Sequence, residues 1–214
     1  MLYGLFAIFV LPWWILWDVL ASKAAFGSLD FTIFSCVNSV LLIFVTGLLT
    51  VAVHDICVGN PPSLTQSFRV GGAALSRLIS LSLRETFLIL IGFVLLILPG
   101  VYLAIAYLFS ASIVIVEGSS PKAALVRSRH LVRGHFWKCL ITYGGCWIFY
   151  FIALSSALFF IEDEEPTLVQ SVVANSLAML LTPVPQIVAV LLYYDVRSRK
   201  ENIDMRVIFA ELPT

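Results

Sequence analysis

Three histidines and four cysteines are the residues of this chain best suited to metal binding or nucleophilic chemistry. No two histidines stand at the i, i+3 or i, i+4 spacing that brings two ligands onto one helix face. The cysteines form no CxxC pair and lie in or beside apolar runs, as small buried hydrophobes do. We therefore predict no metal site, no cofactor site and no disulfide among these residues: His54, His130, His135, Cys36, Cys57, Cys139 and Cys146.

Other catalytic patterns are equally weak. No Ser/His/Asp or Cys/His arrangement has local support, and the acidic run at 162–165 is more simply a solvated loop than a cation site. The glycine pairs at 71–72 and 144–145 indicate close helix contacts better than phosphate-binding loops. We expect the protein not to be an enzyme.

The elements that carry these residues are those of a membrane protein. Hydrophobic residues make up 60% of the 214, and only 12% are charged, far from the averages of soluble domains. The basic residues are also concentrated: 12 of the 13 Lys and Arg fall at 69–84, 122–138 and 197–206. Cytoplasmic loops are rich in Lys and Arg. These three segments are therefore expected on the cytoplasmic side, and we expect no nucleic-acid partner.

Apolar runs of about 20 residues are long enough to span a bilayer. The interval 87–116 could form one long kinked helix or two short ones that turn at Leu98-Pro99-Gly100. Two crossings keep the basic segments on one side, so we favour the hairpin. The prediction is an all-α bundle of six transmembrane helices in three hairpins, with both termini cytoplasmic and a tail at 196–214. The expected spans are about 2–21, 31–54, 80–98, 101–116, 136–161 and 168–194.

The first apolar run has an alternative interpretation as a cleaved signal peptide, because a loosely matching cleavage site follows it at 21–24. It lacks a basic segment at its start and is longer than a usual signal core. We therefore expect a retained span.

Two basic connections have helical periodicity, at about 62–79 and 121–134. Each places apolar residues on one face and cationic residues on the other. We expect both helices to lie along the inner membrane surface and to contact anionic lipid headgroups or partner subunits. The plainer alternative is that these helices only anchor the bundle in the membrane. The candidate basic surface comprises Arg69, Arg77, Arg84, Lys122, Arg127, Arg129, Arg133, Lys138, Arg197 and Arg199.

Polar residues inside the predicted spans are few, and such residues usually face a bundle interior. Asn38, Asn175, Thr182 and Gln186 form a candidate polar seam. Two prolines, at 183 and 185, would break the last span beside it. The seam either lines a binding site or supplies hydrogen bonds between helices.

The three predicted hairpins resemble one another weakly. Each ends on the inner side with an acidic residue, Asp55, Glu117 or Asp195, and a basic stretch follows each. Parallel repeats of this kind occur in transporters and in plain scaffolds.

Several short motifs follow one another in the second half of the chain: LPGVYL (98–103), VEG (116–118), AALVRS (123–128), LVRG (131–134) and YYDVRSRKE (193–201). As a set they resemble the bacterial membrane domain that is fused to some glycerophosphodiester phosphodiesterases and also occurs alone. The resemblance covers roughly residues 30–210. It implies a six-span bundle in a bacterial cytoplasmic (inner) membrane, with no established activity for the domain. The catalytic phosphodiesterase domain is absent from these 214 residues.

Two functions are compatible with this pattern. The first is a non-catalytic structural or accessory subunit of a larger membrane complex, suggested by 28 aromatic residues without catalytic groups. The alternative is a small-molecule or lipid transporter or other lipid-handling protein, suggested by the repeated hairpins and the broken last span.

Overall fold

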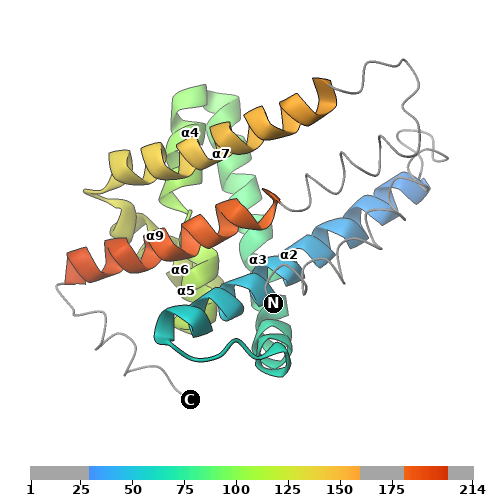
Figure 1. Ribbon diagram of the computed structural model, residues 1–214. Coiled ribbons are helices and arrows are strands. Elements are labelled where there is room, and N and C mark those ends of the chain that lie inside the picture. The colour runs from blue at the N-terminus through green and yellow to red at the C-terminus, as the bar shows by residue number, and fades with distance from the viewer. Residues whose placement is uncertain (1–28, 160–180, 202–214) are drawn as a thin grey trace.

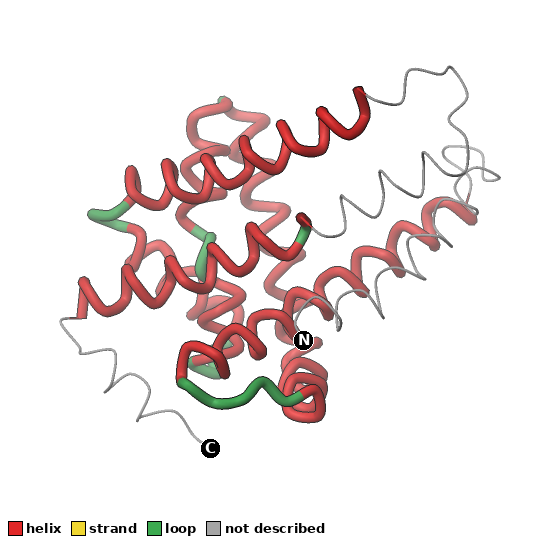
Figure 2. The backbone as a smooth tube through the Cα atoms, viewed as in Figure 1, coloured by secondary structure: helices red, strands yellow, loops and turns green. Residues whose placement is uncertain are grey.

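The computed structural model describes residues 29–159 and 181–201, and in these ranges the chain is helical, without strands (Figures 1 and 2). The all-α prediction is confirmed for them. Predicted span 2–21, residues 168–180 of span 168–194, and Asn175 lie outside the described residues. The helices are α2 (Leu29–Val58), α3 (Leu64–Leu95), α4 (Ile97–Ala106), α5 (Ser110–Val116), α6 (Pro121–Val132), α7 (Phe136–Phe159) and α9 (Pro183–Glu201).

Four described segments are long and apolar enough to cross a membrane. They are Ser35–Val58, Leu64–Leu95, Ile97–Val116 and Phe136–Ala153. A helix rises 1.5 Å per residue, so about 20 residues match a hydrocarbon core of roughly 30 Å.

Glycines set the crossing of α2 and α3. A Cβ on Gly71 would lie 3.0 Å from Leu48 Cδ2, and a Cβ on Gly47 would lie 4.0 Å from the Gly71 Cα. Small residues let two helix backbones approach in this way. The predicted close contact is confirmed at Gly71, whereas a Cβ on Gly72, Gly144 or Gly145 would meet no atom within 4 Å.

The chain turns back between α3 and α4 at Leu96, two residues before the predicted turn at 98–100. Leu96 is extended (φ −167°, ψ 153°), and its N–H donates to Gly92 O at 3.1 Å. Pro99 then lies in the first turn of α4, where a helix needs no N–H donor. The prediction placed the turn at the proline, but a proline starts a helix here.

The helix boundaries differ from prediction at three other places. Residues 62–79 do not form a separate helix, because α3 continues from Leu64 to Leu95. Predicted span 101–116 is divided between α4 and α5, and Ser128 of α6 stabilises the break: its hydroxyl accepts from Phe109 N (3.1 Å) and donates to Ala106 O (2.8 Å). The predicted tail at 196–214 begins inside α9.

Local signals explain the ends of α6. Ser120 precedes it and accepts from Ala123 N, and Pro121 occupies its first turn, both preferred at helix starts. Gly118 (φ +64°) follows α5 and Gly134 (φ +97°) follows α6. Glycine adopts this left-handed conformation at helix ends without the steric cost of a side chain. The predicted helix at 121–134 is thus observed as α6.

Buried side chains of α2, α3, α5, α6 and α9 form one hydrophobic core, and α9 lies along this core (Figure 1). Tyr193, Phe109, Ile113, Leu131 and Val190 are fully buried there. The turn between α3 and α4 and one side of α7 expose large apolar side chains instead. The core therefore positions the polar groups that lie beside it. The turn between α3 and α4 and the exposed side of α7 are apolar surfaces.

Candidate functional site

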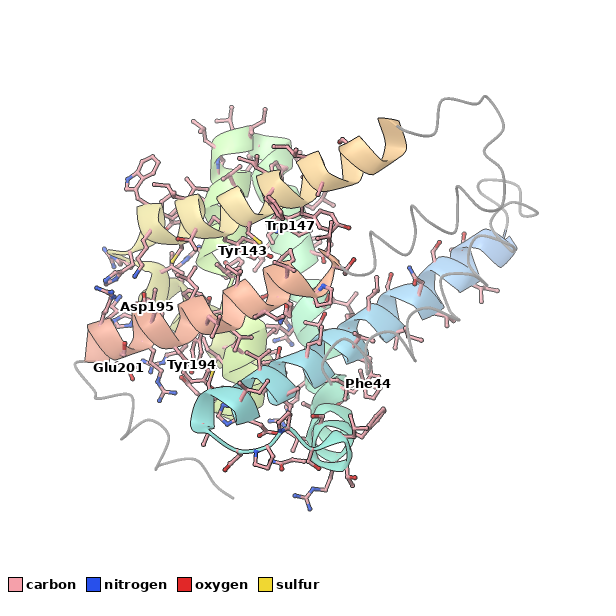
Figure 3. The ribbon with its side chains drawn as sticks, viewed as in Figure 1. Phe44, Tyr143, Trp147, Tyr194, Asp195 and Glu201 are labelled. Atoms are coloured by element: carbon pink, nitrogen blue, oxygen red, sulfur yellow. The ribbon has the colours of Figure 1, made fainter. Side chains whose placement is uncertain are left out.

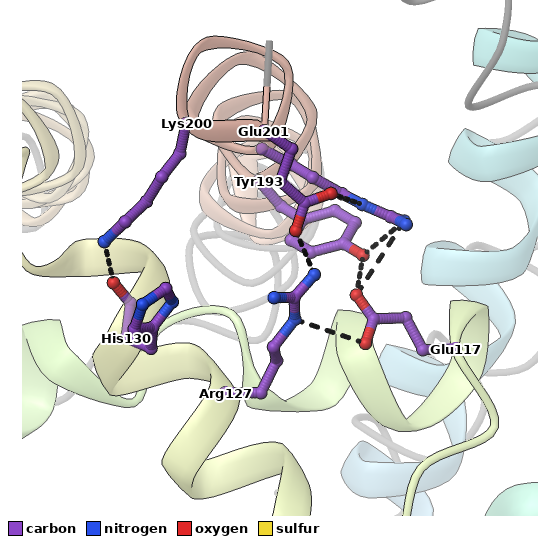
Figure 4. Close-up of polar contacts among 7 residues, drawn as sticks. Glu117, Arg127, His130, Tyr193, Lys200 and Glu201 are labelled. Atoms are coloured by element: carbon purple, nitrogen blue, oxygen red, sulfur yellow. Dashed lines mark hydrogen bonds and ion pairs between the residues drawn. The ribbon is translucent and has the colours of Figure 1, made fainter. Parts of the chain in front are cut away.

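Charged side chains from three helices meet beside the core. Glu117 at the end of α5, Arg127 on α6, and Arg197 and Glu201 on α9 form what we call the ionic cluster (Figure 4). Arg127 Nε lies 3.5 Å from Glu117 Oε2, and Arg197 Nε lies 3.0 Å from Glu201 Oε2. Arg127 also pairs with Glu201. Two acids and two bases alternate, so the cluster carries no net charge.

Tyr193 connects the two sides of the ionic cluster. Its hydroxyl donates to Glu117 Oε1 at 2.9 Å and accepts from Arg197 Nη1 at 3.0 Å. The positive-φ turn at Gly118 places Glu117 near the start of α6, and Arg77 of α3 donates to Gly118 O at 2.8 Å. The cluster thus joins α5, α6 and α9, and Arg77 attaches α3 to the turn beside it.

The electrostatics of the ionic cluster favour its charged state. Partial burial would raise the pKa of Glu201, but its hydrogen bond to Arg197 and the nearby charge of Arg127 outweigh burial and lower that pKa. The cluster contains no nucleophile beside a general base. Its arrangement can hold helices together, and it offers no group placed for covalent chemistry.

A second set of ion pairs joins α9 to α7. Asp195 pairs with Lys138 of α7 and accepts from Arg199 Nε at 2.9 Å. Burial would raise the pKa of Asp195, but these two hydrogen bonds outweigh it and lower the pKa. Lys200 donates to His130 O and to Arg133 O at the end of α6. A cation is favourable there because helix carbonyls point at it.

The structure divides the predicted basic surface into two groups. Arg127, Lys138, Arg197 and Arg199 are engaged in the ion pairs above, and Arg77 binds Gly118. Four of these five side chains therefore pair with acids of α5 or α9, and Arg77 binds a backbone carbonyl, so each has a partner within the chain. Arg84 is half-buried on α3, and Arg129 lies 5.7 Å from the Tyr107 ring centroid. The exposed members are Arg69, Lys122, Arg129, Arg133 and, although it pairs with Asp195, Arg199.

Glu85 makes a polar contact that the sequence analysis did not single out. Its neighbour in sequence is Arg84, but adjacent residues on a helix point to different sides. Glu85 instead contacts the Ser110 hydroxyl of α5, which also lies 2.6 Å from Tyr107 O. No spacing rule in the sequence links residues 85 and 110.

The three acids at the predicted hairpin ends lie on α9 or close to residues that contact α9. Glu117 and Asp195 are ion-paired as described, and Asp55 is buried and accepts from Gln66 Nε2 at 3.4 Å. Beside Asp55, His54 Nδ1 hydrogen-bonds with the Tyr194 hydroxyl of α9. The last helix therefore connects the ends of elements far apart in sequence.

Two of the four residues of the predicted polar seam, Thr182 and Gln186, lie at one cavity. Gln186 Nε2 of α9 donates to Thr50 Oγ1 of α2 at 2.9 Å, and Thr50 donates in turn to Thr46 O at 2.8 Å. Gln186 and Thr182 line a cavity of about 180 Å³ between α2, α7 and α9. Asn38 lies on α2 and is not among the residues that line it. Thr50 is a member of the seam that the prediction missed.

Comparison with known proteins adds a family. No curated protein and no solved structure matches the chain. A family model described as a domain of unknown function, DUF8558, matches residues 66–213. It extends from α3 past the end of α9 and includes all residues of the ionic cluster. It carries no link to glycerophosphodiester phosphodiesterases, so that resemblance stays a prediction. Because the matched region is well over half of the chain, the protein belongs to the DUF8558 family.

Proposed function

We propose that this protein is a non-catalytic integral membrane protein, with six spans in a bacterial inner membrane, that serves as a structural or accessory subunit of a larger membrane complex. The observation that carries the proposal is the exposed side of α7. The stretch Phe136–Ala153 of α7 is apolar enough to span a bilayer, yet only 6% of this stretch is buried within the protein. The exposed apolar residues on it are Trp137, Ile141, Ile148, Phe149, Phe151 and Ile152.

The glycines of α7 favour a protein partner over lipid alone. Gly71 serves a helix crossing within the chain, but Gly144 and Gly145 have open space around them. Small residues on a transmembrane helix commonly mark the place where another helix packs closely. An exposed aromatic surface beside two such glycines suits a transmembrane helix of a partner subunit.

A second contact surface is the exposed basic side of α6, with Lys122, Arg129, His130 and Arg133. It supports the proposed cytoplasmic orientation of this end, since cytoplasmic loops are rich in basic residues. Anionic lipid headgroups attract such a surface by about 1 kcal/mol per basic residue. It would hold the subunit at the inner membrane surface.

The test is to purify the tagged protein from native membranes in a mild detergent. We expect it to migrate as part of a larger complex, whose partners mass spectrometry identifies. Replacing Gly145 by leucine should release the partner, because the added side chain separates the helices. Gly72→Leu is the matched control, since Gly72 also has open space around it but lies on α3. Migration of the unaltered protein only as a small monomer or homodimer would count against the proposal.

A second candidate, transport or handling of a lipid or other small molecule, is favoured by one observation. The cavity between α2, α7 and α9 combines aromatic and polar side chains, as ligand sites do.

A further inference from the structure

The cavity between α2, α7 and α9 has an aromatic wall on α7. Trp147 is central: its ring centroid lies 5.4 Å from that of Tyr150 and 6.3 Å from that of Tyr143, with interplanar angles of 75° and 79°. Edge-to-face contacts of this kind fix ring orientations. Figure 3 shows Tyr143 and Trp147 on α7, close to α9. The wall is therefore a preformed surface on which a flat ring can lie.

The polar groups of the cavity are uncharged donors. Tyr143, Tyr150 and Trp147 carry O–H or N–H groups, as do Thr46 and Gln186. Tryptophan can only donate, and hydroxyls and amides can donate as well as accept. Among the described residues, no charged side chain lines the cavity. Such a lining suits a neutral ligand that presents hydrogen-bond acceptors, and disfavours an ion.

The hydrogen bonds around Gln186 orient its side chain. Its Nε2 donates to Thr50 Oγ1 at 2.9 Å, and Thr50 is itself fully buried and bonded to Thr46 O. An amide nitrogen carries two N–H groups. The bond to Thr50 uses one of them and holds the amide at the cavity wall.

The size of the cavity limits the ligand. Its volume is about 180 Å³, and an apolar cavity of roughly 150 Å³ accepts a benzene ring. Two of its lining residues, Leu42 and Trp147, are 38% and 36% exposed. A single substituted ring therefore fits inside, and a chain attached to it can leave beside these residues on the apolar surface of α2 and α7.

We propose that this cavity binds the ring of a neutral membrane lipid whose ring bears carbonyl oxygens, that is, a lipid of the quinone class. The carbonyls accept hydrogen bonds from the donors, the ring lies against Trp147, and the apolar tail extends into the bilayer. The inference rests on the lipid-handling candidate and identifies its ligand. It is independent of the accessory role, which depends on the opposite, exposed side of α7.

The experiment measures binding of a benzoquinone with a decyl chain to the full-length protein in detergent micelles, by titration calorimetry and by the shift of the melting temperature. Ligand that binds only the folded state raises that temperature. We expect saturable binding that is at least about tenfold weaker in Gln186→Leu or Tyr150→Phe, since a lost hydrogen bond of about 1.4 kcal/mol is tenfold in affinity. Trp137→Phe is the matched control, because Trp137 lies on α7 outside the cavity.

Decanol serves as the ligand control because it has the chain without the ring. Equal binding of decanol and the quinone, with equal loss in the variants, would overturn the quinone inference and leave lipid handling standing. Absence of binding by either compound would overturn both. Unchanged quinone binding in both Gln186→Leu and Tyr150→Phe would also overturn the assigned site. Tyr150→Phe keeps the ring packing, so it tests the site even if Gln186→Leu fails to fold.

Discussion

The ionic cluster and the turn between α3 and α4 are opposite kinds of surface. In the cluster, Arg197 is only 14% exposed and finds two acids within the chain. At the turn, Val94 and Leu98 are 79% and 82% exposed and have only apolar neighbours along the sequence. Exposed apolar surface on this scale is unfavourable in water. The charges of the cluster have partners within the chain, whereas the exposed apolar side chains of the turn need an apolar surrounding such as the bilayer.

The largest effect is expected from a charge placed beside the turn. Leu90→Arg puts a cation on the exposed apolar surface of α3, and Arg at the centre of a span costs about 2.5–3.5 kcal/mol. We expect much less of this variant to resist alkaline extraction from membranes. Val126→Arg, at an exposed position on the basic helix α6 (71% exposed, against 58% for Leu90), should be extracted like the unaltered protein. Equal extraction of the two variants would contradict the distinction between the apolar surface of α3 and the basic surface of α6.

The next effect concerns the ionic cluster. Arg197→Ala leaves Glu117 and Glu201 without one of their partners, and a hydrogen bond to a charged group contributes about 1.5–3 kcal/mol. Arg199→Ala is the control, because that side chain is 60% exposed and exposed ion pairs contribute at most about 1 kcal/mol. Thermal unfolding in detergent should show a clearly lower melting temperature for Arg197→Ala. Similar temperatures for the two variants would show that burial of the cluster contributes little.

A smaller effect is expected at the crossing of α2 and α3. Gly71→Leu must displace Leu48, since a Cβ there already lies 3.0 Å from the Leu48 side chain, and overpacking costs about 1–3 kcal/mol. Gly72→Leu meets open space and should be neutral or stabilising, because leucine favours helix over glycine by up to about 1 kcal/mol. The pair is compared by thermal unfolding, and loss of stability in both would disprove a specific close crossing at Gly71.

The smallest effect is a dependence on pH. The folded-state pKa values of Glu201 and Asp195 are lowered, so their contribution to stability is fully present above the ordinary carboxyl range of about 4. It is lost as the pH falls through the lowered folded-state values. The melting temperature should therefore drop on acidification. It should drop less in Glu201→Gln, because this variant has already lost the contribution of the Glu201 carboxylate to stability. An equal drop would exclude Glu201 as a source.

The sequence predicts the helices of this protein better than it predicts their contacts. Apolar length located α2 and α7, and helical periodicity in a basic connection located α6. The pairing of Arg127 and Arg197 with Glu117 and Glu201 was missed, because it depends on how α9 packs and not on any local spacing. Five of the ten residues of the predicted basic surface consequently have partners within the chain that the sequence did not reveal.

The candidate seam illustrates the same limit. Polar types inside apolar runs identified Gln186 and Thr182, which do line a cavity. The aromatic wall of Tyr143, Trp147 and Tyr150 could not be distinguished from other aromatic residues of α7, because helical spacing alone does not say which side faces α9. Thr50 was missed because its hydroxyl bonds mainly within its own helix.

The most direct test of the central claim measures whether lipid or water surrounds the apolar surface of α3 and the basic surface of α6. In a protein whose cysteines are replaced by alanine, single cysteines at Leu90 and Lys122 carry nitroxide labels, and the protein is reconstituted in lipid bilayers. Electron paramagnetic resonance then compares collisions with oxygen, which concentrates in hydrocarbon, and with a water-soluble nickel complex. We predict oxygen-dominated relaxation at residue 90 and nickel-dominated relaxation at residue 122. Nickel-dominated relaxation at both positions would contradict a membrane-embedded α3.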